Sequence, residues 1–151
     1  MAECTRDWRS SRNTDDKPAG VEPIAEEECL YLLGLRRLGR VAINVDGRPQ
    51  VFPVNYAIGG RTVAFRTAPG TKLANAPMPH VAFEIDDYDS TTGVGWSVMV
   101  KGIANEITDA VDRDSVEVRR HLVRPVAPGQ RDHWVAIRPD EITGRRFRHH
   151  S

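Results

Sequence analysis

Two cations and two hydroxyl groups fall within seven residues of the stretch VFPVNYAIGGRTVAFRTAPGTKLA, residues 51–74. These residues are Arg66, Thr67, Thr71 and Lys72, and Gly70 lies among them. An arginine offers a planar fork of N–H donors, a lysine offers a mobile positive charge, and hydroxyl groups add further donors. The combination predicts a site for a phosphate dianion at the end of a hairpin. The plainer alternative is a solvated loop that carries ordinary surface cations.

The spacing of these residues does not fit two common nucleotide sites. A P-loop requires the pattern Gly-x-x-x-x-Gly-Lys-Ser/Thr. Here Thr71 separates Gly70 from Lys72, and Phe65 stands where the first glycine is needed. The chain also lacks the pattern GxGxxG, so a Rossmann dinucleotide site is not indicated.

The composition indicates one domain without bulk attraction to polyanions. The chain has 151 residues, with 21 Lys plus Arg against 21 Asp plus Glu. A net charge near zero does not indicate binding to nucleic acid or to an anionic membrane. We expect a cytoplasmic protein, because no apolar leader or run of about 20 apolar residues occurs. Residues 1–22 are polar and are predicted to be a disordered tail, followed by a domain over residues 23–148.

Hydrophobic periodicity predicts a mainly β fold. A helix is expected over residues 24–38, with Gly39 as its stop, and a second over residues 112–123. Gly70 to Ala76 is expected to form a short helix or turn. Asp46-Gly47 and Gly59-Gly60 are tight turn signals that divide a three-stranded meander between Arg40 and Thr67. Further strands are expected over residues 80–86, 96–107, 134–138 and 142–147, with Gly102 as a bulge. This pattern predicts a six- or seven-stranded antiparallel barrel with flanking short helices.

Other chemically active side chains give weaker patterns. The five histidines have no zinc spacing, so no metal site is predicted. His121 and His133 are the candidates for a haem ligand, although surface positions explain them as well. The acidic run of Glu84, Asp86, Asp87 and Asp89 is interpreted as a solvated strand end rather than a metal site. No catalytic acid, base or nucleophile is assigned.

A series of short motifs runs in a fixed order from about residue 28 to residue 144. The series consists of Glu28-Cys29 with Leu32-Leu33, Gly39-Arg40-Val41-Ala42, Asp46-Gly47-x-Pro49, Pro53-Val54-Asn55-Tyr56, Phe65-Arg66-Thr67, Gly70-Thr71-Lys72-Leu73, Val81-Ala82-Phe83-Glu84 and the strand from Ser97 to Ala104. In order and spacing it resembles the pyridoxamine 5′-phosphate oxidase-like flavin-binding split barrels, and within them the subgroup that includes nitroimidazole-resistance proteins.

The resemblance implies a split barrel that binds FMN at a homodimer interface. In that arrangement Arg66, Thr67, Thr71 and Lys72 hold the phosphate. Other residues lie around the flavin ring in that arrangement, and they are Val54, Asn55, Tyr56, Trp96, Ser97 and Trp134. For Trp134, core packing is an equal alternative, and Tyr56 is equally interpreted as a cross-strand core residue.

The same resemblance implies an FMN-dependent oxidoreductase acting on a small molecule. The chain is shorter than true pyridoxamine-phosphate oxidases and lacks a clear counterpart of their C-terminal arginine motif, for which Arg145 and Arg146 are the only candidates. Oxidation of vitamin B6 is therefore not the expected activity. The alternatives are a reductase that uses the deazaflavin F420, a non-catalytic flavin or haem sensor or carrier, and a structural dimer with an empty pocket.

Overall fold

A computed structural model describes residues 20–67, 80–106 and 133–148. These residues form seven strands and one helix. In chain order they are β1 (Val21–Ile24), α1 (Glu26–Leu35), β2 (Leu38–Val45), β3 (Arg48–Gly59), β4 (Thr62–Thr67), β5 (His80–Asp89), β6 (Val94–Glu106) and β7 (His133–Arg148). The expected helix over residues 112–123 and the short helix or turn over residues 70–76 lie outside the described residues.

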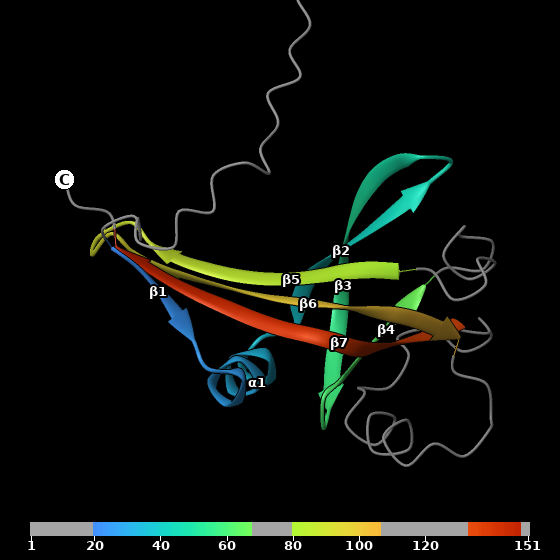
Figure 1. The fold of residues 1–151 in the computed structure, drawn as a ribbon, viewed down its shortest axis with the longest axis horizontal. Coiled ribbons are helices and arrows are strands. Elements are labelled where there is room, and N and C mark those ends of the chain that lie inside the picture. Colours follow the sequence, from blue (N-terminus) through green and yellow to red (C-terminus); the bar gives the residue numbers. More distant parts are fainter. Residues whose placement is uncertain (1–19, 68–79, 107–132, 149–151) are drawn as a thin grey trace, which may run out of the picture.

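The strands form one antiparallel sheet that closes on itself. Their order is β1-β7-β4-β3-β2-β5-β6, and an additional pairing of β6 with β7 joins the two sides. Six strands therefore make a barrel, and β1 extends it by pairing with β7. Figure 1 shows β7 beside β6 along the length of the molecule, with β3 and β4 crossing these long strands steeply. The predicted antiparallel split β-barrel is confirmed, with seven strands.

The predicted meander of β2, β3 and β4 is also confirmed. Asp46 and Gly47 have φ angles of 52° and 75°, which is the pair of positive values that a tight hairpin with a type I′ turn requires. The second turn is shifted by one residue from the expected Gly59-Gly60. Gly59 still pairs with Thr62, so Gly60 and Arg61 make the turn.

The predicted helix over residues 24–38 is too long at both ends. Ile24 belongs to β1 because it pairs with Gly144, and Leu38 belongs to β2 because it pairs with Asn55. Gly39 is not a helix stop but a buried position inside β2. A Cβ atom there would lie 2.2 Å from the ring of Phe83, so close packing requires glycine. Because β1 begins at Val21, the expected end of the tail at residue 22 falls inside a strand.

The two closing strands expected over residues 134–138 and 142–147 are one continuous strand. Pro139 and Asp140 resemble a break in the sequence, but the ladder continues past them. Lys101 pairs with Glu141 and Gly102 pairs with Pro139, so Asp140 is the extra residue. The register shift at Lys101 and Gly102 confirms the predicted bulge, which accommodates a proline without a backbone N–H group.

Side chains that point into the barrel form its core. Alternate residues of the strands are fully buried, including Phe65, Phe83, Val98, Val100 and Ile137. The helix α1 closes part of the barrel with Cys29, Leu32 and Leu33, and it packs against β7, β3 and β6 (Figure 1). Among the described residues, no helix has the length and apolar character needed to cross a membrane.

Candidate functional site

A row of side chains crosses the outer wall of the barrel from β2 to β7. Leu38 pairs with Asn55, and Arg66 pairs with Trp134. The adjacent pair of Tyr56 and Phe65 is buried, so strand alternation places Asn55 and Arg66 on the opposite, outer face. Three of the residues predicted to contact the cofactor, Asn55, Arg66 and Trp134, therefore share one face of three neighbouring strands.

Arg66 and Trp134 form a cation–aromatic pair within this row. The guanidinium carbon of Arg66 lies 4.5 Å from the centre of the Trp134 ring. Such a contact uses the electron-rich face of the indole, whereas the N–H donors of a guanidinium lie in its own plane. The pair therefore combines a fixed cation with a flat apolar surface, and both are half-buried.

The two neighbours of Asn55 on β3 point toward the interior. Val54 packs against the core, and Tyr56 is 6% exposed. The Tyr56 ring packs edge-on against Phe83, with 4.8 Å between ring centres, and its hydroxyl donates to the Leu33 carbonyl oxygen at 2.6 Å. Burial raises the pKa of Tyr56 well above its ordinary value, with a smaller opposing effect from Arg36. The side chain of Tyr56 is thus a cross-strand core residue, and its contact with a bound ring would be through the backbone.

Trp96 and Ser97 lie on β6 with their side chains on opposite faces. Trp96 packs partly against the core, and the guanidinium carbon of Arg36 lies 5.6 Å from the centre of its ring. Ser97 is half-buried and pairs with Asp86 on one side and Arg145 on the other. The structure therefore separates these two adjacent residues into different environments.

Trp96 and Trp134 are far apart within one chain. Trp96 pairs with Arg146 near the end of β7, whereas Trp134 is the second residue of that 16-residue strand. The strand between them spans roughly 40 Å at about 3.3 Å per residue. These two residues therefore cannot wall the same ring from one subunit.

The structure describes only some of the residues that are predicted to bind the phosphate. Thr67 is the last residue of β4, and its backbone pairs with His133. Thr71 and Lys72 lie outside the described residues. Their role as phosphate ligands, like that of Thr67, stays a prediction.

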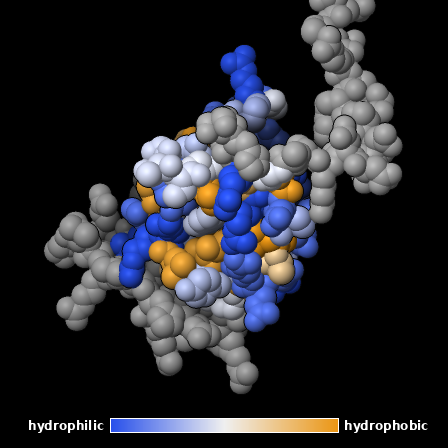
Figure 2. Space-filling model, turned by 90° about the vertical axis from the view of Figure 1, so that its left-hand side faces the viewer, coloured by the Kyte–Doolittle hydropathy of each residue, from blue (hydrophilic) through white to orange (hydrophobic). Residues whose placement is uncertain are grey.

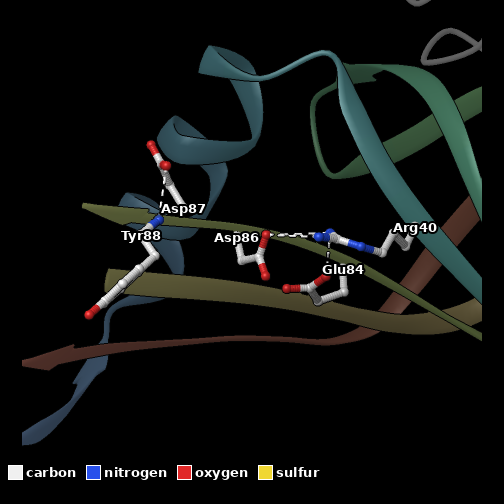
Figure 3. A network of polar contacts seen from close by, with 5 residues as sticks. All are labelled: Arg40, Glu84, Asp86, Asp87 and Tyr88. Carbon is white, nitrogen blue, oxygen red and sulfur yellow. Dashed lines mark hydrogen bonds and ion pairs between the residues drawn. The ribbon is translucent and has the colours of Figure 1, made fainter. Parts of the chain in front are cut away.

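A charged network on β2 and β5 was not recognised as such from the sequence. Arg40 donates to Glu84 and to Asp86, each at 3.1 Å, as Figure 3 shows. Arg36 pairs with Asp87. Burial is the main cause that raises the pKa of Glu84, with Asp86 acting in the same direction and Arg40 opposing it. Three members of the run interpreted as a solvated strand end, Glu84, Asp86 and Asp87, thus pair with Arg36 and Arg40, a relation that depends on the β2–β5 pairing. The described residues contain no cluster suited to a metal ion.

The fold defines the class of protein as a split β-barrel, and comparison with known proteins defines the family. The family model described as pyridoxamine 5′-phosphate oxidase matches residues 25–146. The chain belongs to this family.

Individual relatives agree with this assignment. A FAD-binding protein of Mycobacterium smegmatis is 41% identical, with a TM-score of 0.74, and the match covers 85% of this chain and all of that one. A Corynebacterium glutamicum protein, described as a candidate pyridoxamine 5′-phosphate oxidase, is 30% identical, with a TM-score of 0.70, over 90% of this chain and 99% of that one. An uncharacterized Mycobacterium tuberculosis protein is 31% identical over 144 residues, which are 91% of this chain and 93% of the relative.

Proposed function

We propose that the protein is a flavin-dependent oxidoreductase acting on a small molecule. The observation that carries this proposal is the outer-wall row in which Asn55 lies beside the Arg66–Trp134 pair. A cation fixed against an indole ring suits a ligand that joins an anionic phosphate to a flat ring system, as a flavin nucleotide does. Family membership supports the same cofactor class.

Each residue of the predicted site has a role in this proposal that its chemistry supports. Arg66 supplies charge-assisted hydrogen bonds to phosphate oxygens, together with Lys72 and the hydroxyls of Thr67 and Thr71. Asn55 offers an exposed amide at the edge of the ring. A bound flavin supplies the hydride or electron transfer, while the protein supplies binding, orientation and electrostatics.

The resemblance in sequence implies FMN, and one comparison favours FAD as a second candidate. The Mycobacterium smegmatis protein that is 41% identical is described as FAD-binding. Both cofactors share the ring and the phosphate nearest to it, so the same row serves either. The cofactor that co-purifies with the protein decides between them after release and chromatography.

We also propose that the site is completed by a second copy of the chain. Trp96 and Trp134 are too far apart to contact one ring from a single subunit, but in a homodimer each can come from a different copy. Sedimentation of the purified protein tests this proposal directly, since a monomer at micromolar concentration would remove it.

Binding and turnover separate the redox proposal from its competitors. The purified protein is expected to show flavin absorption or to bind FMN or FAD at micromolar concentrations, and a Soret band or F420 binding would identify the other cofactors instead. Arg66→Ala and Lys72→Ala should each weaken flavin binding about tenfold or more. Unchanged affinity in both variants refutes the phosphate assignment. Turnover of quinones, nitro compounds or aldehydes with reduced cofactor distinguishes an enzyme from a carrier.

A further inference from the structure

A groove of about 680 Å³ lies where the end of α1 meets β2, β3 and β5. Its volume is in the range that small ligands occupy in proteins. Three arginines line it, Arg36, Arg37 and Arg40, together with two aspartates, Asp86 and Asp87. Charged side chains thus line a surface depression to which Asn55, Arg66 and Trp134 do not contribute.

In the part of the chain that the structure describes, every charged side chain lining the groove has an ion-pair partner except Arg37. Arg40 is held by Glu84 and Asp86, and Arg36 is held by Asp87. Among residues 20–67, 80–106 and 133–148, no carboxylate forms an ion pair with Arg37. The two aspartates are thus already paired, and Arg37 is the arginine of the groove that no carboxylate of the described residues pairs with.

The backbone fixes the position from which Arg37 extends. Its carbonyl oxygen accepts a hydrogen bond from the Tyr56 N–H group at 2.9 Å. The Tyr56 hydroxyl in turn donates to the Leu33 carbonyl oxygen at 2.6 Å. The buried Tyr56 therefore holds both ends of the segment from Leu33 to Arg37. A cation on a fixed backbone loses less conformational freedom when it binds a ligand.

Apolar side chains also line the groove. Leu35, Leu38 and Val51 line it, and they are 57%, 62% and 61% exposed. These three residues are among the most exposed large hydrophobic residues of the described chain. On the face of the molecule that Figure 2 shows, hydrophobic side chains are likewise interspersed with hydrophilic ones. A ligand that suits this lining carries one anionic group and an apolar body.

We propose that this groove binds a small organic anion, a carboxylate or phosphate monoester with an apolar body, through Arg37. The guanidinium fork pairs with two oxygens of such a group, and the apolar body covers Leu38 and Val51. The groove borders the proposed flavin face, because Leu38 pairs with Asn55 across β2 and β3. Binding in the groove does not depend on a flavin and is testable without one.

Calorimetry with four probes tests the proposal on the purified full chain. The probes are benzoate, phenyl phosphate, the neutral benzyl alcohol, and acetate, which has the charge without a large apolar body. Benzoate or phenyl phosphate is expected to bind at least tenfold more tightly than benzyl alcohol and acetate. Comparison of the first two probes identifies the preferred anion. Equal binding of benzoate and benzyl alcohol overturns the proposal.

Two variants and a matched control locate the site. Arg37→Gln is expected to weaken benzoate binding about tenfold or more, as loss of a charge-assisted hydrogen bond does. Arg48→Gln removes an exposed arginine of β3 outside the groove and should leave the affinity unchanged. Leu38→Gln is expected to weaken benzoate binding but not acetate binding.

The readouts keep this proposal separate from the flavin proposal. Unchanged benzoate affinity in Arg37→Gln overturns the groove assignment, whatever the cofactor. Visible absorption of the same samples reports flavin independently, so absence of flavin refutes only the redox function. Circular dichroism of each variant confirms that the exposed substitutions leave the fold intact.

Discussion

The guanidinium carbon of Arg66 lies 4.5 Å from the centre of the Trp134 ring, and the Cα atoms of the two residues pair across β4 and β7. The neighbouring pair of Phe65 and Val135 is buried in the core. The register of two core strands thus fixes the outer pair, so the position of Arg66 depends on packing inside the barrel as well as on its own contacts.

We expect this pair to act as a unit in flavin binding. Trp134→Ala should weaken binding between about twofold and thirtyfold, since cation–aromatic contacts contribute about 0.5–2 kcal/mol. Trp134→Phe keeps an aromatic face and should retain most of the affinity. In a double-mutant cycle, Arg66→Ala combined with Trp134→Ala should cost less than the sum of the two single changes. Strict additivity by fluorescence titration would show that the two residues act independently.

The second prediction concerns the buried hydroxyl of Tyr56. Tyr56→Phe leaves the Leu33 carbonyl oxygen without this donor and is expected to lower the free energy of unfolding by about 1 kcal/mol. Urea unfolding at neutral pH measures this change. An unchanged midpoint would mean that the hydrogen bond contributes nothing net to stability.

The same residue predicts a loss of stability in alkali. Burial raises the pKa of Tyr56, so the folded protein keeps a proton that the unfolded chain releases near pH 10. The stabilising contribution is therefore complete below about pH 10 and is lost as the pH rises toward the higher folded pKa. Between about pH 9 and 11, wild-type protein should lose stability more steeply than Tyr56→Phe. Parallel pH profiles for the two proteins would contradict this.

Two glycines give predictions of opposite sign. A Cβ atom on Gly102 would lie 2.0 Å from the backbone oxygen of Arg138, so Gly102→Ala must disturb the bulge between β6 and β7. We expect a loss of about 1–3 kcal/mol or more. Gly34 lies in α1, and open space surrounds the position that a methyl group would occupy there, so Gly34→Ala should add about 0.5–1 kcal/mol. Thermal unfolding of both variants checks the two signs together.

Local signals in the sequence were sufficient for the meander and its first turn. Asp46 and Gly47 require only each other to form a tight turn, and alternation within β2 identifies its buried face without knowledge of its partners. The same local reasoning divided β7 at Pro139. Only the pairing with Lys101 and Gly102, which are distant in sequence, shows how the strand continues.

The candidate site was predictable as a set of residue types but not as an arrangement. Arg66 and Trp134 are far apart in the chain, and nothing near either residue indicates that β4 pairs with β7. The orientation of Tyr56 remained open for a related reason, because both a core position and a site position fit a tyrosine on β3. The ion pairs of Arg40 likewise depend on the neighbouring position of β5.

The last prediction concerns Arg40 and Glu84, which lie on neighbouring strands in Figure 3. Burial and the nearby Asp86 raise the pKa of Glu84, and Arg40 opposes them. Arg40→Gln removes the opposing charge, so the pKa of Glu84 should rise further. Carbon NMR of the carboxyl group measures this shift directly, and Arg48→Gln is the matched control.

The linked effect on stability has a definite sign. Because the folded pKa of Glu84 exceeds the unfolded one, the favourable contribution of its protonated form is complete below about pH 4 and is lost as the pH rises through the folded pKa. Arg40→Gln enlarges that loss. The variant should therefore resemble wild type most closely in urea unfolding near pH 4 and fall furthest below it near pH 7. A stability difference that stays constant over this range would show that Arg40 acts through packing of its side chain rather than through its charge.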